Sequence, residues 1–285
     1  MEFPELRNKK IAIVGMGYMG RNMLRFLGSF KETHNIDLYS FDRKNLTEIK
    51  RHTFDLVFNC AGNTGDFRKR PNETIESNLA VTKFLTEEAN IREALILLSS
   101  TRIYGFTGDS GTIYDERSPV PVKDHLDPDF IYNGTKMLLE SLARQLVRPY
   151  RIVTCRLSNV YGRYSADDLD DSTYLKVMLK HCVKKEKISL NQNVQSTKDY
   201  IFIDDAVDGI LRAALYSKAT DIYNIAAGES YSLENWLNFL GLEYGNIPGS
   251  IPNHSCISIS AAKRELGFTP QHSLKNLNIK QIIHS

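Results

Sequence analysis

Short apolar runs alternate with longer segments of helical periodicity through the first two thirds of the chain. The apolar runs are Ile11 to Val14, Ile36 to Phe41, Leu56 to Cys60, Leu95 to Leu98 and Ile152 to Leu157. The helical patterns cover Tyr18 to Phe30, Thr74 to Ala89 and Phe130 to Arg148. Strands that alternate with helices in this way form a parallel sheet with helices on both faces. The pattern therefore predicts an α/β fold with a Rossmann-like, doubly wound parallel sheet.

The alternation breaks after Tyr164, where an acidic loop, Asp167 to Asp171, leads into a basic helix. Two further apolar runs, Ile201 to Ile203 and Ile222 to Ile225, enclose the helical pattern Asp204 to Tyr216. We interpret both runs as returns to the sheet. The tail that follows mixes short helical patterns with turns that contain Pro and Gly, which is typical of a small lobe over the mouth of a sheet.

The length of the chain agrees with two coupled lobes, because single cores stop growing near roughly 250 to 300 residues. We expect a main domain of residues 1–164 plus 200–226. Residues 165–199 plus 227–285 are expected to form a smaller, mainly C-terminal lobe that binds the substrate.

Charge and hydropathy narrow the choice of partners. The 36 basic and 34 acidic side chains leave a formal charge of +2, so no global field favours nucleic acid or a membrane surface. No apolar run approaches the about 18 residues of a membrane span, and Met1 to Lys10 lacks the apolar core of a signal peptide. We expect a cytoplasmic protein that acts on a small molecule.

The cysteines and histidines predict no metal site. Cys60, Cys155, Cys182 and Cys256 lie far apart without a Cys-x-x-Cys pair, and the seven histidines form no His-x-x-x-His pair. Buried free thiols are the simplest interpretation of this spacing.

A glycine-rich segment directly follows the first predicted strand. Gly15-Met16-Gly17-Tyr18-Met19-Gly20 fits Gly-x-Gly-x-x-Gly and opens an amphipathic helix. In this context the first glycine permits a tight turn, Gly17 lets the backbone approach a pyrophosphate, and Gly20 lets helix and strand pack closely. The diphosphate would then meet the positive end of the helix dipole. The segment predicts a nicotinamide dinucleotide site in the main domain.

Two adjacent residues bear on the choice of dinucleotide. Asp42 closes the second predicted strand, where a carboxylate accepts hydrogen bonds from the adenosine ribose and repels a 2′-phosphate. Arg43, which follows it, has the side chain that would clasp such a phosphate. NAD and NADP both stay open, with NAD slightly favoured.

A catalytic set is expected at the carboxyl end of the sheet. Tyr132 and Lys136 stand four residues apart on one predicted helix, so both side chains project from one face. A neighbouring ammonium and an oxidised nicotinamide would lower the pKa of the phenol, and Tyr132 would then exchange a proton with a substrate hydroxyl. Ser100, just past a predicted strand, would orient the same oxygen.

These motifs, taken in order, resemble the extended short-chain dehydrogenase/reductases, that is, the NAD-dependent epimerase/dehydratase family that acts largely on nucleotide sugars. The similar segments run nearly end to end: Asn59 to Gly62, the segment from Asn78, Ser99 to Gly105, Tyr132 to Lys136, Arg156 to Gly162, Lys198 to Asp205, Asp221 to Ile225 and Lys263 to Gly267.

The resemblance implies roles for individual residues. It makes Ser100, Tyr132 and Lys136 catalytic. The cofactor would be bound by Gly15, Gly17, Tyr18, Met19, Gly20, Asp42, Arg43, Cys60, Ala61, Gly62, Asn78, Ser99, Tyr132, Lys136 and Val160. The substrate would be bound by Ser100, Thr101, Arg102, Asn159 and Lys198. Family members commonly pair through the helices similar to Thr74 to Ala89 and Phe130 to Arg148, so a homodimer is implied by analogy.

Several positions depart from the family pattern. Only 12 residues separate Asp42 from Asp55, which leaves little room for the usual third strand and helix. Thr101 and Arg102 stand where dehydratases carry Asp-Glu, which argues against a 4,6-dehydratase. Lys198 replaces an arginine that typically binds substrate phosphate. The acidic loop would repel a nucleotide diphosphate if it lined the cleft.

Three functions remain open on this evidence. The first is an NAD(P)-dependent epimerase or 4-ketoreductase of a nucleotide sugar, with Tyr132 as acid and base. The second is an oxidoreductase of a small, uncharged alcohol or ketone. The third is a non-catalytic protein that binds dinucleotide.

Overall fold

The structure is a computed structural model of the 285-residue chain. It describes residues 3–65, 67–106, 111–121, 125–165, 168–169, 173–190, 192–245 and 251–283.

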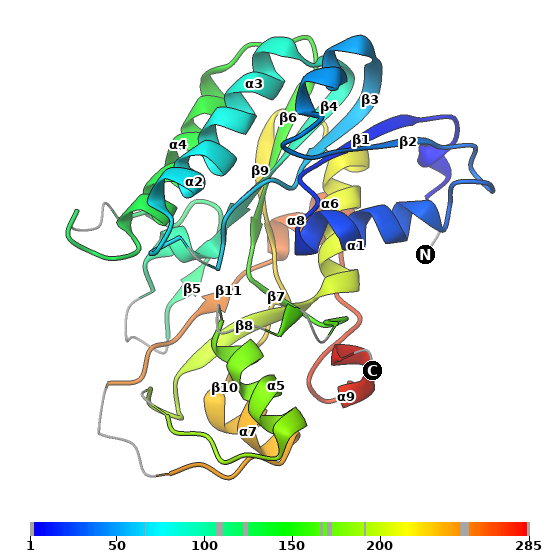
Figure 1. The fold of residues 1–285 in the computed structure, drawn as a ribbon. Coiled ribbons are helices and arrows are strands. Elements are labelled where there is room, and N and C mark those ends of the chain that lie inside the picture. Colours follow the sequence, from blue (N-terminus) through cyan, green and yellow to red (C-terminus); the bar gives the residue numbers. More distant parts are fainter. Residues whose placement is uncertain are drawn as a thin grey trace.

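A six-stranded parallel sheet forms the centre of the molecule (Figure 1). Its strands are β1 (Lys10–Val14), β2 (Asp37–Phe41), β3 (Thr53–Asn59), β4 (Asn90–Ser100), β6 (Arg151–Leu157) and β9 (Asp221–Ile225). They lie in the order β2-β1-β3-β4-β6-β9, and every pairing is parallel. The predicted Rossmann-like fold is confirmed.

Helices cover both faces of this sheet, as the continuous apolar strands require. Alternate residues of β1 enter different cores: Ile11 and Ile13 pack with α1 (Tyr18–Gly28) and α6 (Ile203–Tyr216). Ala12 and Val14 face the opposite core, to which α3 (Val81–Glu88) and α4 (Phe130–Gln145) contribute. This alternation is the expected result of side chains that point to opposite faces of a strand.

The predicted helix Thr74 to Ala89 is divided in the structure. It consists of α2 (Pro71–Ile75), a π-helical turn (Glu76–Ala80) and α3. A π-helical turn inside a helix is uncommon and occurs frequently at functional sites. This turn carries Asn78, one of the predicted cofactor-binding residues.

The short segment between β2 and β3 has the structure that its length predicts. Between β2 and β3 lies a single 3-10 helix, Leu46–Arg51, and β3 pairs directly with β1. The expectation that the usual third strand and helix are missing is therefore confirmed within this fully described part of the chain. Because no described strand follows β2 on its outer side, β2 lies at the edge of the sheet.

One of the two predicted returns to the sheet is wrong. Ile222 to Ile225 lies in β9, at the edge of the main sheet. Ile201, by contrast, lies in β8 (Thr197–Phe202), which pairs with β7 (Asn159–Tyr161) and β10 (Ser230–Ser232) in a separate three-stranded sheet. An apolar run indicates burial, but it does not say which sheet buries it. Ile203 already begins α6.

The small sheet packs with helices in the lower lobe of Figure 1. There α5 (Tyr174–Lys184) contacts α7 (Leu233–Leu240), and Trp236 of α7 is fully enclosed by rings. Its ring centre lies 5.1 Å from those of Tyr161 and Tyr200. The remaining elements are β5 (Ile113–Tyr114), β11 (Cys256–Ile257), α8 (Ser260–Leu266), α9 (Ile279–Ile282), and the 3-10 helices Pro4–Leu6 and Thr101–Tyr104.

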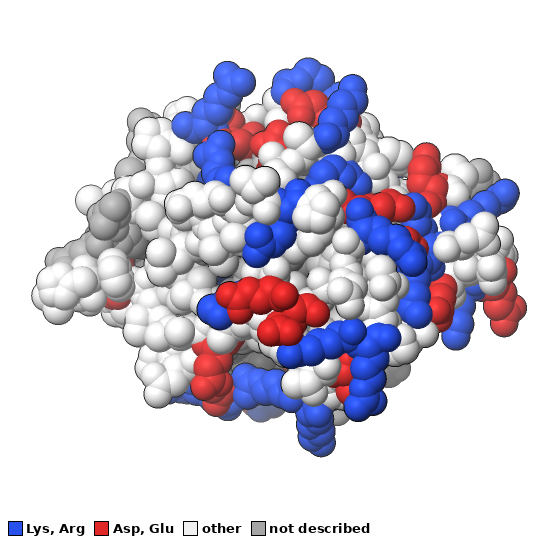
Figure 2. Space-filling model, turned by 90° about the horizontal axis from the view of Figure 1, so that it is seen from above, with Lys and Arg blue, Asp and Glu red and all other residues white. Residues whose placement is uncertain are grey.

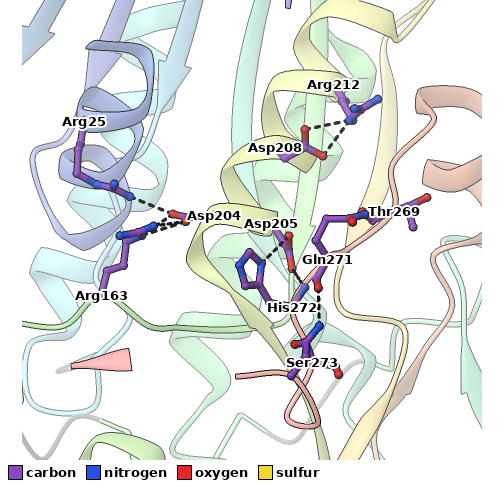
Figure 3. A network of polar contacts seen from close by, with 11 residues as sticks. Arg25, Arg163, Asp204, Asp205, Asp208, Arg212, Thr269, Gln271, His272 and Ser273 are labelled. Atoms are coloured by element: carbon purple, nitrogen blue, oxygen red, sulfur yellow. Dashed lines mark hydrogen bonds and ion pairs between the residues drawn. The ribbon is translucent and has the colours of Figure 1, made fainter. Parts of the chain in front are cut away.

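Acidic residues of α6 attach other segments to the sheet (Figure 3). Asp204 accepts hydrogen bonds from Arg25 of α1 at 3.0 Å and from Arg163 at 2.8 Å. Asp205 accepts the main-chain N–H of His272 in the C-terminal tail at 2.8 Å. The Asp-Asp pair that contributes to the family resemblance thus joins the two lobes.

The surface carries both signs of charge. Figure 2 shows basic and acidic side chains interspersed over the face seen from above, in agreement with the formal charge of +2. Among the described residues, no helix is long and apolar enough to cross a membrane.

Candidate active site

The glycine segment forms a tight turn between β1 and α1. Gly15 has a φ of +93°, and a Cβ on it would lie 2.5 Å from the amide nitrogen of Ala61. A Cβ on Gly20 would lie 1.9 Å from the carbonyl oxygen of Gly15. Gly17, at the N-cap of α1, has no atom within 4 Å of its Cβ position. Two glycines therefore permit backbone contact, whereas Gly17 borders open space.

That open space belongs to a groove of about 550 Å³ at the carboxyl ends of β1, β2 and β3. Seven predicted cofactor-binding residues line it, namely Gly15, Gly17, Asp42, Arg43, Cys60, Ala61 and Gly62. The other wall includes the π-helical turn, with Glu76, Ser77 and Ala80, and the apolar side chains Leu46, Val81 and Phe84. A groove with backbone N–H groups at one end and apolar walls at the other fits an adenine dinucleotide.

Two residues of the glycine segment point elsewhere. Tyr18 stacks on Tyr164 at 5.1 Å between ring centres, and its hydroxyl donates to the Gly162 carbonyl at 2.5 Å. Met19 packs against the core on the α1 side of the sheet. Neither side chain lines the groove.

Asp42 and Arg43 both border the groove, as the sequence predicts. The Asp42 carboxylate accepts the main-chain N–H of Lys44 at 2.7 Å, which fixes the turn after β2. Arg43 is 70% exposed and lies 3.5 Å from the Glu73 carboxylate across the groove. The positions of the two residues suit either dinucleotide.

The inner end of the groove carries an unsatisfied polar atom. Asn78 donates to the Thr135 hydroxyl at 2.9 Å, whereas its Oδ1 is buried without a hydrogen-bond partner among the described residues. A Cβ on Gly62 would lie 3.1 Å from this oxygen and 3.6 Å from Nζ of Lys136. Buried polar atoms normally have partners, so this one points to a bound ligand.

Ser100, Tyr132 and Lys136 come together at this end, at the carboxyl edge of β4. Lys136 donates to the Leu98 carbonyl at 2.8 Å, and its Nζ lies 5.9 Å from the centre of the Tyr132 ring. The Ser100 hydroxyl is close enough to the Tyr132 phenol to lower its pKa, against the effect of burial. All three side chains are at least 90% buried.

Burial controls how these groups titrate. It raises the pKa of the Tyr132 phenol, against the opposing effects of the Ser100 hydrogen bond and the positive charge of Arg102. Burial lowers the pKa of Lys136 to about 8, although the Glu140 carboxylate opposes it. In this state Tyr132 is therefore a protonated phenol at neutral pH, ready to donate its proton.

A buried polar cluster behind the site was not predicted. Glu140, one helical turn after Lys136, accepts from Arg156 at 2.7 Å and from the Ser99 hydroxyl at 2.6 Å. Arg156 also donates to the Tyr104 hydroxyl at 2.8 Å. The side chain of Ser99 is thus directed to Glu140. The four-residue spacing from Lys136 was the available signal, since it places Glu140 on the same helix face.

Phe67 was also missed, because it lies in a loop with no recognisable pattern. Its ring centre lies 4.8 Å from that of Tyr132. The guanidinium of Arg102 lies 5.2 Å from the Phe67 ring centre and 5.7 Å from the Tyr132 ring centre. Phe67 and Arg102 therefore border the phenol.

The other predicted site residues lie on several elements. Thr101 is buried at the start of the 3-10 helix after β4, and Val160 is half-buried in β7. Asn159 of β7 donates to the Asp199 carbonyl at 2.8 Å. Lys198 of β8 lines a small hollow with Tyr174 and Tyr231.

The predicted acidic loop is described in part. Asp167, Asp170 and Asp171 lie outside the described residues. Asp168 pairs with Arg21 of α1 at 2.6 Å, so its charge is compensated at the surface of the molecule. Across the described ranges, no group of three or more His, Cys, Asp or Glu side chains is placed to hold a metal ion.

Comparison with known proteins agrees with this geometry. The sequence model of the NAD-dependent epimerase/dehydratase family matches residues 9–226. The chain belongs to this family. It is 26% identical over 245 residues to dTDP-4-dehydro-6-deoxyglucose reductase of Escherichia coli, a match that covers 80% of this chain and 74% of the relative. The expectations of an extended short-chain dehydrogenase/reductase enzyme and of an NAD or NADP cofactor are confirmed.

Solved structures show the same family fold. RMD from Pseudomonas aeruginosa, complexed with NADPH, has a TM-score of 0.78 at 16% identity, covering 96% of this chain and 97% of that one. MoeE5 in complex with UDP-glucose and NAD has a TM-score of 0.76 at 17% identity, with the same coverage. At these identities the likeness concerns the fold alone.

Proposed function

We propose that this family member transfers hydride at a carbon of a nucleotide-activated sugar, as a 4-ketoreductase or an epimerase. The convergence of Ser100, Tyr132 and Lys136 at the inner end of the dinucleotide groove carries the proposal. When bound, the nicotinamide supplies or accepts the hydride. The residues that would hold the dinucleotide are Gly15, Gly17, Asp42, Arg43, Cys60, Ala61, Gly62, Asn78 and Lys136, together with Val160.

The three catalytic side chains have separate roles in this proposal. Tyr132 donates its phenolic proton to the substrate oxygen as the carbonyl carbon is reduced, and it removes that proton in the reverse direction. Ser100 orients the same oxygen, because it lies at the end of β4 and acts on the Tyr132 phenol. The ammonium of Lys136 stabilises the phenolate that remains and holds the nicotinamide ribose, next to Gly62 and Asn78.

One comparison favours the reductase over the epimerase. The relative from Escherichia coli that matches 80% of this chain is a dTDP-sugar reductase. A relative from Burkholderia thailandensis, dTDP-L-rhamnose 4-epimerase, matches 52% of this chain. Loss of the dinucleotide on desalting would support the reductase, and its retention the epimerase.

We also propose a homodimer that forms through the outer faces of α2, α3 and α4. Ile75 of α2 and Leu138 of α4 are 44% and 59% exposed, so apolar surface is available there. Light scattering on the wild type and on Leu138→Glu tests this proposal. A dimer that becomes a folded monomer in the variant is expected, and a monomeric wild type would refute it.

A thermal-shift titration tests the main proposal. NAD, NADH, NADP and NADPH are added singly and then with a panel of nucleoside diphosphates, because a ligand of the native state raises its stability. We expect a dinucleotide shift that one nucleoside diphosphate increases. A dinucleotide shift that no nucleotide increases would favour a small, uncharged ketone as substrate. Unchanged biological activity of a Tyr132→Phe variant would favour a non-catalytic binding protein.

A further inference from the structure

An arginine lies beside the ring of Tyr132. Arg102 follows Ser100 by two residues on the 3-10 helix Thr101–Tyr104, and its main-chain N–H donates to the Ser100 hydroxyl at 3.2 Å. Its guanidinium lies 5.7 Å from the centre of the Tyr132 ring. The side chain is 40% exposed, so part of its fork of N–H donors is accessible.

Positive charge exceeds negative charge around this point. Arg102 and Arg68 both pair with one carboxylate, that of Asp129, which Arg68 contacts at 2.6 Å. Two guanidinium groups therefore share a single carboxylate beside Tyr132.

The position of Arg102 distinguishes the two anionic parts that a sugar nucleotide can carry. The diphosphate is attached to carbon 1 of the sugar, across the ring from carbon 4, where a 4-ketoreductase or 4-epimerase reacts. A cation beside the ring of Tyr132 would lie near carbon 4 and its neighbours, carbons 3 and 5. Of the groups attached to these carbons, carbon 6, on carbon 5, is the one that is a carboxylate in a uronic acid.

Resting on the function proposed above, we propose that Arg102 binds a carboxylate on the sugar and that the substrate is a nucleotide-linked uronic acid. Arginine suits this role because its planar fork matches a carboxylate in bidentate geometry. Arg102 stands at one of the two positions that argue against a 4,6-dehydratase, and in this proposal it selects the sugar.

Binding of a matched pair of ligands tests this inference. Calorimetry on the NAD-loaded protein compares UDP, UDP-glucose and UDP-glucuronic acid, which differ only in the sugar and its carboxylate. We expect UDP-glucuronic acid to bind about 10- to 100-fold more tightly than UDP-glucose, as a charge-assisted contact implies. Arg102→Gln should remove this preference and leave the affinities for UDP and UDP-glucose unchanged, and Arg102→Lys should restore part of it.

Arg68→Gln is the matched control. Arg68 pairs with the same Asp129 and lies 5.2 Å from the centre of the same Phe67 ring, yet it makes no ring contact with Tyr132. This variant should keep the preference. The melting temperature of each variant, measured with and without NAD, tests whether the fold and the dinucleotide site are intact.

Two results would overturn the inference and leave the proposed function standing. One is equal binding of UDP-glucose and UDP-glucuronic acid by the wild type. The other is an Arg102→Gln variant that loses the same factor for UDP as for UDP-glucuronic acid, since Arg102 would then hold the diphosphate. If no nucleoside diphosphate binds the NAD-loaded protein, the proposed function itself fails.

Discussion

The dinucleotide groove and the substrate side of the molecule are built in different ways. Gly15 and Gly17 follow β1, Asp42 follows β2, and Cys60 to Gly62 follow β3. The groove is thus made largely of main chain at consecutive strand ends. The residues predicted to bind the substrate, by contrast, are side chains on separate elements: Arg102 after β4, Asn159 of β7 and Lys198 of β8.

This difference explains why the family shares a cofactor and varies its substrates. A site made of main chain requires particular residue types at few positions, chiefly glycines where a Cβ would collide. A site made of side chains can change its preference with one substitution, which is the role proposed above for Arg102. Tyr132 and Lys136 stand where the two regions meet, and substitutions can change the function of one region without the other.

The largest effect is expected where the regions meet. Tyr132→Phe removes the proton donor and should lower turnover by about 10²- to 10⁴-fold. Because the phenol contacts Ser100 and not the glycine turn, the thermal shift with dinucleotide should persist. Tyr39→Phe, on the edge strand β2, is the control and should leave turnover unchanged. Loss of dinucleotide binding in Tyr132→Phe would contradict the separation of the two regions.

Glu140→Ala tests the buried support behind both regions. The variant leaves the Arg156 guanidinium buried without its carboxylate, since the two side chains are 8% and 6% exposed. We expect the free energy of unfolding in urea to fall by about 3 to 5 kcal/mol. Glu87→Ala, which breaks an exposed pair with Lys83, should cost at most about 1 kcal/mol. A loss in Glu140→Ala no larger than in this control would show that the cluster is not structural.

Gly17→Ala should affect the groove alone. The new methyl meets no protein atom within 4 Å, and the backbone of Gly17 is extended, so the melting temperature without ligand should hold. The methyl instead occupies space proposed for the pyrophosphate and should weaken dinucleotide binding by about 10- to 100-fold. Gly28→Ala at the end of the same helix also meets no atom within 4 Å. Equal dinucleotide affinity in these two variants would exclude Gly17 from the phosphate site.

The smallest effect concerns pH. The pKa of Lys136 is about 8 in the folded protein and lies below the ordinary value of 10.5. Between these two pKa values the unfolded chain binds more protons than the folded protein, so this group makes the free energy of unfolding rise with pH. The cost of burying the Lys136 ammonium is therefore fully present below about pH 8. Lys136→Met removes that cost. Its gain in unfolding free energy over the wild type should be greatest near neutral pH, at about 1 to 3 kcal/mol, and should shrink toward pH 10. A gain that is independent of pH would show that Lys136 titrates normally.

Sequence patterns predicted more of the cofactor side than of the substrate side. The spacing from Asp42 to Asp55 correctly predicted the missing third strand, because chain length limits what fits between two strands. The apolar run at Ile201 was assigned to the wrong sheet, because burial in either sheet selects the same residues. Phe67 has no pattern that marks it as a neighbour of Tyr132, since loops place side chains without periodicity.

The sequence by itself determined the order of strands and helices, the glycine turn and the four-residue spacing of Tyr132 and Lys136. Each of these depends on local chain geometry, which has a fixed period or a fixed steric limit. The tertiary structure alone decided that β8 joins a second sheet, that Glu140 pairs with Arg156, and that Arg102 lies beside Tyr132. Those contacts join residues far apart in the chain, and their energies depend on burial and charge that exist only after the two lobes have packed.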